Sequence, residues 1–118
     1  MKRFLAIYIG TEDAQRRAKW NELGEQQRQT LIDSGMKAWM DWGMKHSTAI
    51  VDHGNPLGPT KRASGNGITD IKNAMTGYVI VEAESHEAAA ALFRNHPHFS
   101  IFPGDSVEIM ECLPVPSR

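Results

Sequence analysis

The stretch Gly77-Tyr-Val-Ile-Val-Glu-Ala83, followed by Glu84-Ser-His-Glu-Ala-Ala-Ala-Ala-Leu92, decides the fold class of this chain. It predicts a strand that runs directly into a helix. Side chains alternate between the two faces of a strand, so Val79 and Val81 lie on one face and Tyr78 lies on the other. Both faces are apolar, and a strand of this kind needs cover on both sides.

The rest of the chain predicts short elements around this unit. Gly10 and Thr11 end the first strand and cap a helix, and Asn66-Gly67 is a typical hairpin turn. The resulting order is an α+β, ferredoxin-like βαββαβ pattern with a helical insert and an extra β-hairpin. The expected strands are 3–9, 48–52, 60–63, 68–72, 77–83 and 107–113, and the expected helices are 12–23, 25–46 and 86–94. One face of the second helix carries Ile32, Met36, Trp39, Met40 and Gly43 at spacings of three and four.

The apolar second face of the sheet predicts a homodimer. Right-handed crossovers place both helical connections on the same side of a sheet. The other side, with Tyr78 and Ile80, is then bare, and an exposed apolar face of this size marks an interface. We therefore expect two copies to pack sheet against sheet.

Length, charge and cysteine content narrow the class of protein further. At 118 residues, the chain is expected to form a single domain over residues 1–118. Its formal net charge of −1 argues against binding to nucleic acid, which needs a basic face. We expect no membrane association, since no apolar run is long enough to span a bilayer. The lone Cys112 is expected to be a buried thiol in a reducing, cytoplasmic environment.

Several motifs resemble those of the YCII-related family, in its longer, DGPF-like branch, within the dimeric α/β-barrel superfamily. Together with the first strand they span about residues 36–116. The motifs are Trp39-x-x-Trp42, Val51-Asp-His-Gly-Asn-Pro-Leu-Gly58, Gly67-Ile-Thr-Asp70, Thr76-Gly-Tyr-Val-Ile-Val-Glu-Ala-Glu-Ser85, His96-Pro97-His98 and Ser106-Val-Glu-Ile-Met-Glu-Cys-Leu-Pro114.

This resemblance implies a pair of ferredoxin-like chains forming a dimeric α/β barrel, with a cleft between the sheet and neighbouring loops. Some members are proposed to use a His–Asp pair there, and a few relatives act on small aromatic or lactone compounds. Asp70 falls at the family's acidic position. The window for the family's first-helix histidine holds residues 36–40, centred on Trp39, so His46 is the nearest substitute. Asp70 and His46 are therefore the candidate catalytic residues.

Four further residues are candidates for ligand binding, and each has a structural alternative. Trp42 lies off the apolar stripe and could line a pocket for a flat ligand, or pack in the core. Tyr78 could hold a ligand or fill the dimer interface. Asp52 and His98 are polar candidates near the cleft, although His98 could also be a surface residue beside a helix-capping His96. Asp70 itself could be a structural turn residue.

No metal site and no cofactor are expected. The five histidines are scattered, whereas a tetrahedral metal site needs three or four converging ligands. The stretch Gly54-Asn-Pro-Leu-Gly58 with Lys61 lacks the spacing of a phosphate-binding loop. Two function classes remain open: an enzyme for acid–base chemistry on a small, perhaps cyclic, organic molecule, and a non-catalytic dimeric module that binds a small molecule or a partner.

Overall fold

A four-stranded antiparallel sheet forms the centre of the computed structural model, which describes residues 1–116. The strand order is β2-β5-β1-β6, so the two apolar strands, β5 and β1, lie in the centre of the sheet. This is the order of a ferredoxin-like sheet, and the predicted α+β fold class is confirmed. The strands are β1 (Lys2–Ile9), β2 (Ile50–Asp52), β5 (Met75–Ala83) and β6 (Ser106–Glu111).

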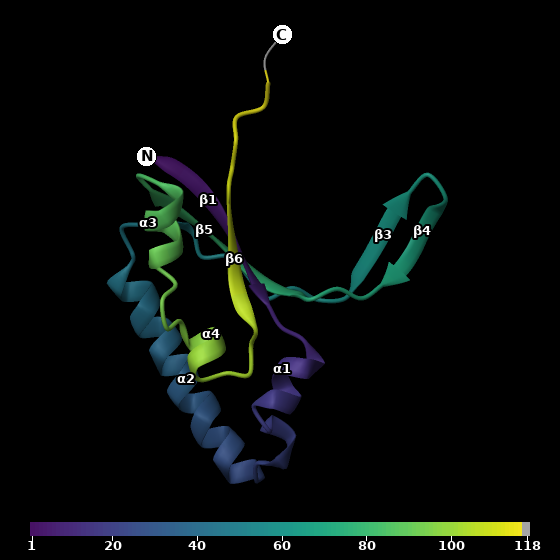
Figure 1. Ribbon diagram of the computed structural model, residues 1–118, viewed down its shortest axis with the longest axis vertical. Coiled ribbons are helices and arrows are strands. Elements are labelled where there is room, and N and C mark those ends of the chain that lie inside the picture. The colour runs from purple at the N-terminus through teal and green to yellow at the C-terminus, as the bar shows by residue number, and fades with distance from the viewer. Residues whose placement is uncertain (117–118) are drawn as a thin grey trace.

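The helices cover one side of this sheet, as the crossover rule predicts (Figure 1). Thr11 and Ser85 cap α1 and α3 through their hydroxyl groups, as expected from the sequence. Within the described residues, no helix is both long and apolar enough to cross a membrane. The helices are α1 (Glu12–Arg17), a 3₁₀ turn η1 (Trp20–Glu22), α2 (Glu25–Lys45), α3 (His86–Ala91) and α4 (Pro97–Ser100).

The register of β1 and β5 separates the two faces of the sheet. Phe4 pairs with Val81 and Ala6 with Val79, and all four side chains are buried beneath the helices. The alternate positions form the opposite face, which no helix covers in Figure 1. This open face is made by Leu5, Ile7, Ile9, Tyr78, Ile80 and Met110.

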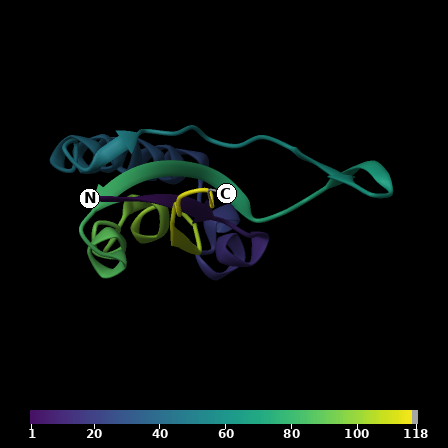
Figure 2. The ribbon, with the colours of Figure 1, turned by 90° about the horizontal axis from the view of Figure 1, so that it is seen from above.

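The predicted hairpin is confirmed as strands β3 (Thr60–Ser64) and β4 (Gly67–Ile71). It stands well away from the sheet in both views (Figures 1 and 2). The longest dimension of the chain is 58 Å, and its radius of gyration is 16.4 Å. A compact chain of this length has a radius of gyration of about 13.5 Å, so the chain is more extended than a compact domain, as an arm that stands away from the sheet requires.

The apolar stripe of α2 is only partly buried, and the burial predicted for Cys112 is wrong. Met36 and Met40 are 55% and 66% exposed, whereas Trp39 of the same stripe and Trp42 both pack against the core. The indole N–H of Trp42 donates to the Leu92 carbonyl oxygen at 2.8 Å, which turns this side of α2 toward α3. Cys112 is exposed, because it follows the last residue of β6 instead of lying inside the strand.

Candidate functional site

An apolar cleft lies between α2 and the end of the sheet. It consists of two adjoining cavities of about 520 and 410 Å³, which share Tyr8, Trp39, Met40 and His53. Volumes of this size are typical of sites for small organic ligands. We refer to the two cavities together as the α2 cleft. Trp42 and Val79 line its first part, and Asn55, Pro56, Gly77, Tyr78 and Phe102 line its second part.

The outer wall of the α2 cleft is the segment 53–57, which is held against β5. The amide of Tyr78 donates to the Asn55 carbonyl oxygen at 3.3 Å, and the amide of Leu57 donates to the Thr76 carbonyl oxygen at 2.9 Å. Gly54 makes this close approach feasible. Its φ is +67°, and a Cβ at this position would lie 1.7 Å from the carbonyl oxygen of Tyr78. The turn motif thus places His53 at the rim of the cleft.

The floor of the α2 cleft is a cluster of rings around Tyr8 and His96. The Tyr8 hydroxyl oxygen lies 3.4 Å from Nε2 of His96. The Trp39 ring packs 4.9 Å from Tyr8 and 4.5 Å from His96, between ring centres. Burial raises the pKa of Tyr8. It also lowers the pKa of His96 to about 3, aided by the nearby charges of His98 and His46. Both groups are therefore neutral over the physiological pH range.

The two histidines of the His96-Pro-His98 motif belong to the short helix α4. His96 is its N-terminal cap and is fully buried, so the alternative that His96 ends the preceding helix is wrong. Pro97 occupies the first turn, where its missing N–H costs nothing. The ring of His98 is buried too, and its Nε2 lies 2.7 Å from the Ile9 carbonyl oxygen. Since a carbonyl only accepts, this nitrogen of His98 carries the proton.

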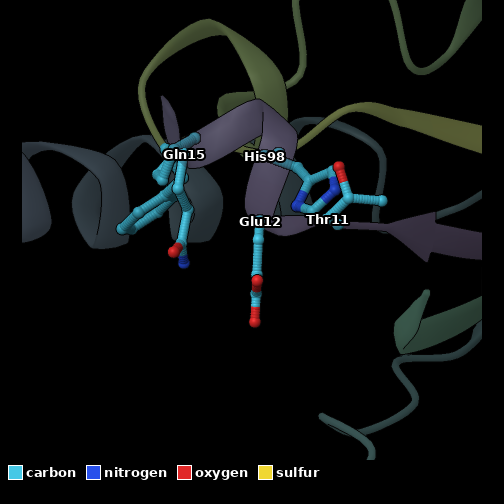
Figure 3. A pocket seen from close by; sticks show the side chains of 8 residues that line it. Thr11, Glu12, Gln15 and His98 are labelled. Atoms are coloured by element: carbon cyan, nitrogen blue, oxygen red, sulfur yellow. The ribbon is translucent and has the colours of Figure 1, made fainter. Parts of the chain in front are cut away.

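His98 lines a separate pocket of about 310 Å³ at the start of α1, which we call the His98 pocket. Figure 3 shows its ring beside Thr11, with the side chains of Glu12 and Gln15 extending away from the ring. Thr11 is itself bonded to Asp105 through its amide and hydroxyl, at 2.7 and 2.9 Å. The hydroxyl contact, with Arg17, keeps the pKa of Asp105 below its usual range. The polar groups of Thr11 and Asp105 are therefore already hydrogen-bonded to each other, and they fix the start of α1 to the loop before β6.

The candidate catalytic residues do not meet within one chain. Asp70 lies on the hairpin and is bonded to Lys61 at 2.6 Å, with 82% of its side chain exposed. His46 follows the last residue of α2, where its ring packs 5.3 Å from the ring of Trp42. Burial, and then the charge of Lys45, lowers the pKa of His46. The hairpin and the end of α2 lie on opposite sides of the molecule (Figures 1 and 2). The individual roles of Asp70 and His46 stay predictions.

Of the four predicted ligand-binding residues, two line the α2 cleft. Trp42 lines the larger cavity and Tyr78 the smaller one. Asp52 lines neither of them. Its Oδ1 accepts a hydrogen bond from the Gly54 amide at 2.8 Å, which stabilises the turn that carries His53. His98 lines its own pocket, as described above.

Two residues that line the α2 cleft, Tyr8 and His53, were not singled out as site residues by the sequence, and neither was His96, which is buried against Tyr8. Tyr8 lies at the end of an apolar strand and looks like any core residue. Its partner His96 is 88 positions away, so only the fold brings the two together. His53 had a usable signal, because it lies inside the turn motif at 51–58. Among residues 1–116, no group of three or more histidine, cysteine or acidic side chains is arranged to hold a metal ion.

Comparison with known proteins shows no family for this chain and one weakly similar solved structure. No family model and no curated protein matches the chain, so its assignment to the YCII-related family stays a prediction. Among solved structures, the chain is similar to 5-chloro-2-hydroxyhydroquinone dehydrochlorinase from Burkholderia phenoliruptrix, in complex with 2,5-dihydroxybenzoquinone. The identity is 19% over 93% of this chain and 91% of that chain, with a TM-score of 0.47. A likeness at this level carries no argument about activity or ligand.

Proposed function

We propose that the protein is a small enzyme that carries out acid–base chemistry on a flat, cyclic organic molecule bound in the α2 cleft. One observation carries this proposal. The cleft combines aromatic walls with a buried Tyr8–His96 pair in its floor and the exposed imidazole of His53 at its rim. A mostly apolar cavity with a few converging polar groups is the usual form of a site for a small molecule.

The two polar sides of the cleft are suited to different tasks. Because burial raises the pKa of Tyr8, its hydroxyl stays protonated and can stabilise a developing negative charge on oxygen. His53 is exposed, and imidazole is the side chain best suited to accept a proton near neutral pH. The simplest reaction for this pair is proton abstraction next to a carbonyl group. The C–H bond breaks, the proton moves to His53, and the electron pair forms an enolate whose oxygen faces Tyr8.

Deuterium exchange tests this reaction directly. We expect the protein to accelerate the exchange of the α-hydrogens of 1-indanone in D₂O, followed by proton NMR. His53→Gln should lower the exchange rate by about 100-fold, the typical contribution of a general base. His86→Gln is the matched control, since it makes the same substitution at an exposed histidine on α3 that lines neither cavity. Exchange no faster than in buffer, or unchanged in His53→Gln, contradicts the proposed chemistry.

The second candidate function is a non-catalytic binding module. It is favoured by the neutrality of Tyr8 and His96, neither of which exchanges protons near pH 7. Within the described residues, His53 is then the one histidine, acidic or basic side chain that lines the cleft. The same experiment separates the two candidates. An enzyme accelerates exchange, whereas a binding module perturbs the NMR signals of 1-indanone without exchanging its hydrogens.

We further propose that the protein acts as a homodimer through the open face of the sheet. The chain exposes 8628 Å², whereas a compact monomer of this mass exposes about 6,400 Å². The excess, about 2,200 Å² per chain, is in the range that obligate homodimers bury. We expect light scattering to give twice the 13.2 kDa chain mass. Ile80→Lys should give a monomer, while Ala90→Lys, on the exposed side of α3, should remain a dimer. A wild-type monomer at micromolar concentration contradicts this proposal.

Dimerisation gives the hairpin arm a role. The arm extends away from its own sheet, so we propose that it reaches the partner subunit and brings Asp70 to the edge of the partner's cleft. The support is its position in Figures 1 and 2 and the exposure of Asp70. In this arrangement each site contains residues of both chains, and His46 stays behind the Trp42 wall of its own chain.

A further inference from the structure

The hydrogen bonds of His96 fix which of its ring nitrogens carries a proton. His96 is 0% exposed, and the backbone N–H of His98 donates to its Nδ1 at 3.0 Å. A backbone N–H only donates, so Nδ1 offers a lone pair and carries no hydrogen. A neutral imidazole has one N–H group, and here it must be on Nε2. The pKa of His96, lowered by burial to about 3, keeps the ring in this neutral form.

The direction of the bond between His96 and Tyr8 follows from this tautomer. Nε2 of His96 lies 3.4 Å from the Tyr8 hydroxyl oxygen. Since Nε2 carries the hydrogen, it donates and the Tyr8 oxygen accepts. The hydroxyl hydrogen of Tyr8 must then point elsewhere. Among residues 1–116, this hydroxyl makes no other hydrogen bond, although Tyr8 is only 5% exposed.

The empty space next to Tyr8 is the α2 cleft, because Tyr8 lines both of its cavities. We propose that the Tyr8 hydroxyl donates its hydrogen to the ligand, and that the ligand presents a hydrogen-bond acceptor at this point, namely a carbonyl, enolate or phenolate oxygen. His96 is the positioning residue that sets the direction of this donation. The inference rests on the proposed function, in which the α2 cleft is the ligand site, and it adds the chemical group that the ligand must carry.

The opposite arrangement has a different consequence. If the hydrogen of His96 were on Nδ1, the Tyr8 hydroxyl would donate to Nε2, and its oxygen would be left to accept from a ligand N–H or O–H group. The amide of His98 excludes this arrangement, because it would then face an N–H group. The cleft is therefore selective for acceptors over donors, and a ligand without an acceptor would leave a buried hydroxyl unpaired.

The tautomer can be tested without a ligand. Long-range ¹H–¹⁵N NMR of protein labelled at histidine distinguishes a protonated from an unprotonated ring nitrogen. We expect His96 to carry its proton on Nε2 and to show no titration between pH 8 and pH 5, in spite of the neighbouring His98, His46 and Tyr8. A proton on Nδ1, or titration within this range, overturns the inference and removes Tyr8 as the donor to the enolate oxygen, while proton abstraction by His53 is decided separately by the exchange experiment.

The selectivity can be tested with a matched pair of probes. 1-Indanone and indane have the same ring system and differ by one carbonyl oxygen. We expect wild-type protein to bind 1-indanone at least tenfold more tightly, measured by quenching of tryptophan fluorescence. Tyr8→Phe, checked for folding by circular dichroism, should bind both probes with the weaker affinity of indane.

The outcomes of the probe test separate the two proposals. Equal binding of both probes to the wild-type protein, or a preference that survives in Tyr8→Phe, overturns the acceptor proposal alone. If neither probe binds to the wild-type protein, the α2 cleft is not the ligand site, and the proposed function and this inference fail together.

Discussion

Acidification should destabilise the protein through His96. The imidazole has a pKa of about 3 in the folded chain and an ordinary value of 6.5 when it is exposed by unfolding. Between these values the unfolded chain binds a proton that the folded chain does not bind, so the free energy of unfolding falls as the pH falls. A solution at pH 5 is about 1.5 pH units below the ordinary histidine pKa of 6.5. At about 1.4 kcal/mol per unit, the expected loss between pH 8 and pH 5 is about 2 kcal/mol.

Urea unfolding, followed by tryptophan fluorescence at several pH values, measures this loss. His96→Gln keeps an amide hydrogen for Tyr8 and cannot titrate, so its stability should change less between pH 8 and pH 5; the lowered pKa of His46 contributes in the same window and remains in this variant. His53→Gln is the control, because it removes an exposed histidine and leaves the buried rings around His96 in place. The low pKa of Asp105 acts only below about pH 4, since its ordinary value is 3.8. A wild-type loss below about 0.5 kcal/mol, or an equal loss in His96→Gln, refutes the reasoning.

Three further predictions concern the cleft wall and the hairpin. Gly54→Ala should lower the free energy of unfolding by more than about 2 kcal/mol, because a Cβ there overlaps the Tyr78 carbonyl oxygen. Gly58→Ala, which has open space around it, should change the free energy of unfolding by less than about 0.5 kcal/mol. Similar values for both variants would contradict the structure. Asp70→Asn should keep the free energy of unfolding within about 0.5 kcal/mol of the wild-type value, since the ion pair of Asp70 is exposed. It should lower the rate of hydrogen exchange of 1-indanone at least tenfold. An unchanged exchange rate removes Asp70 from the site. Amides of residues 64–67 should exchange rapidly with solvent, and strong protection there would contradict a free hairpin tip.

The features that the sequence predicts well are those set by local patterns. Alternation along residues 77–83 separates the two faces of β5, and the register with β1 confirms it. The turn residues at 54–58 and the Asn66-Gly67 pair mark the cleft wall and the hairpin tip. Thr11 and Ser85 cap their helices as expected. In each case the residues that determine the local structure lie in the same short stretch as the structure itself.

The features that the sequence misses depend on distant contacts. The spacing of Met36, Trp39 and Met40 on α2 suggests one shared buried face, but only Trp39 packs against the core, while both methionines are exposed at the α2 cleft. The burial of His96 results from packing by rings from β1, from α2 and from the turn after α3, which the motif around Pro97 does not reveal. The separation of Asp70 from His46 depends on where the hairpin points. These three features depend on contacts between distant segments, so no short stretch of sequence predicts them.

Mapping of NMR shifts with 1-indanone tests whether the α2 cleft is the ligand site. Titration of ¹⁵N-labelled protein should shift the signals of the Trp39 indole and of the amides of His53 and Gly77, which surround the cleft. In Tyr8→Phe the same signals should shift only at higher concentrations of 1-indanone. Shifts confined to the hairpin around Lys61 and Asp70, or no shifts at millimolar 1-indanone, would contradict the account.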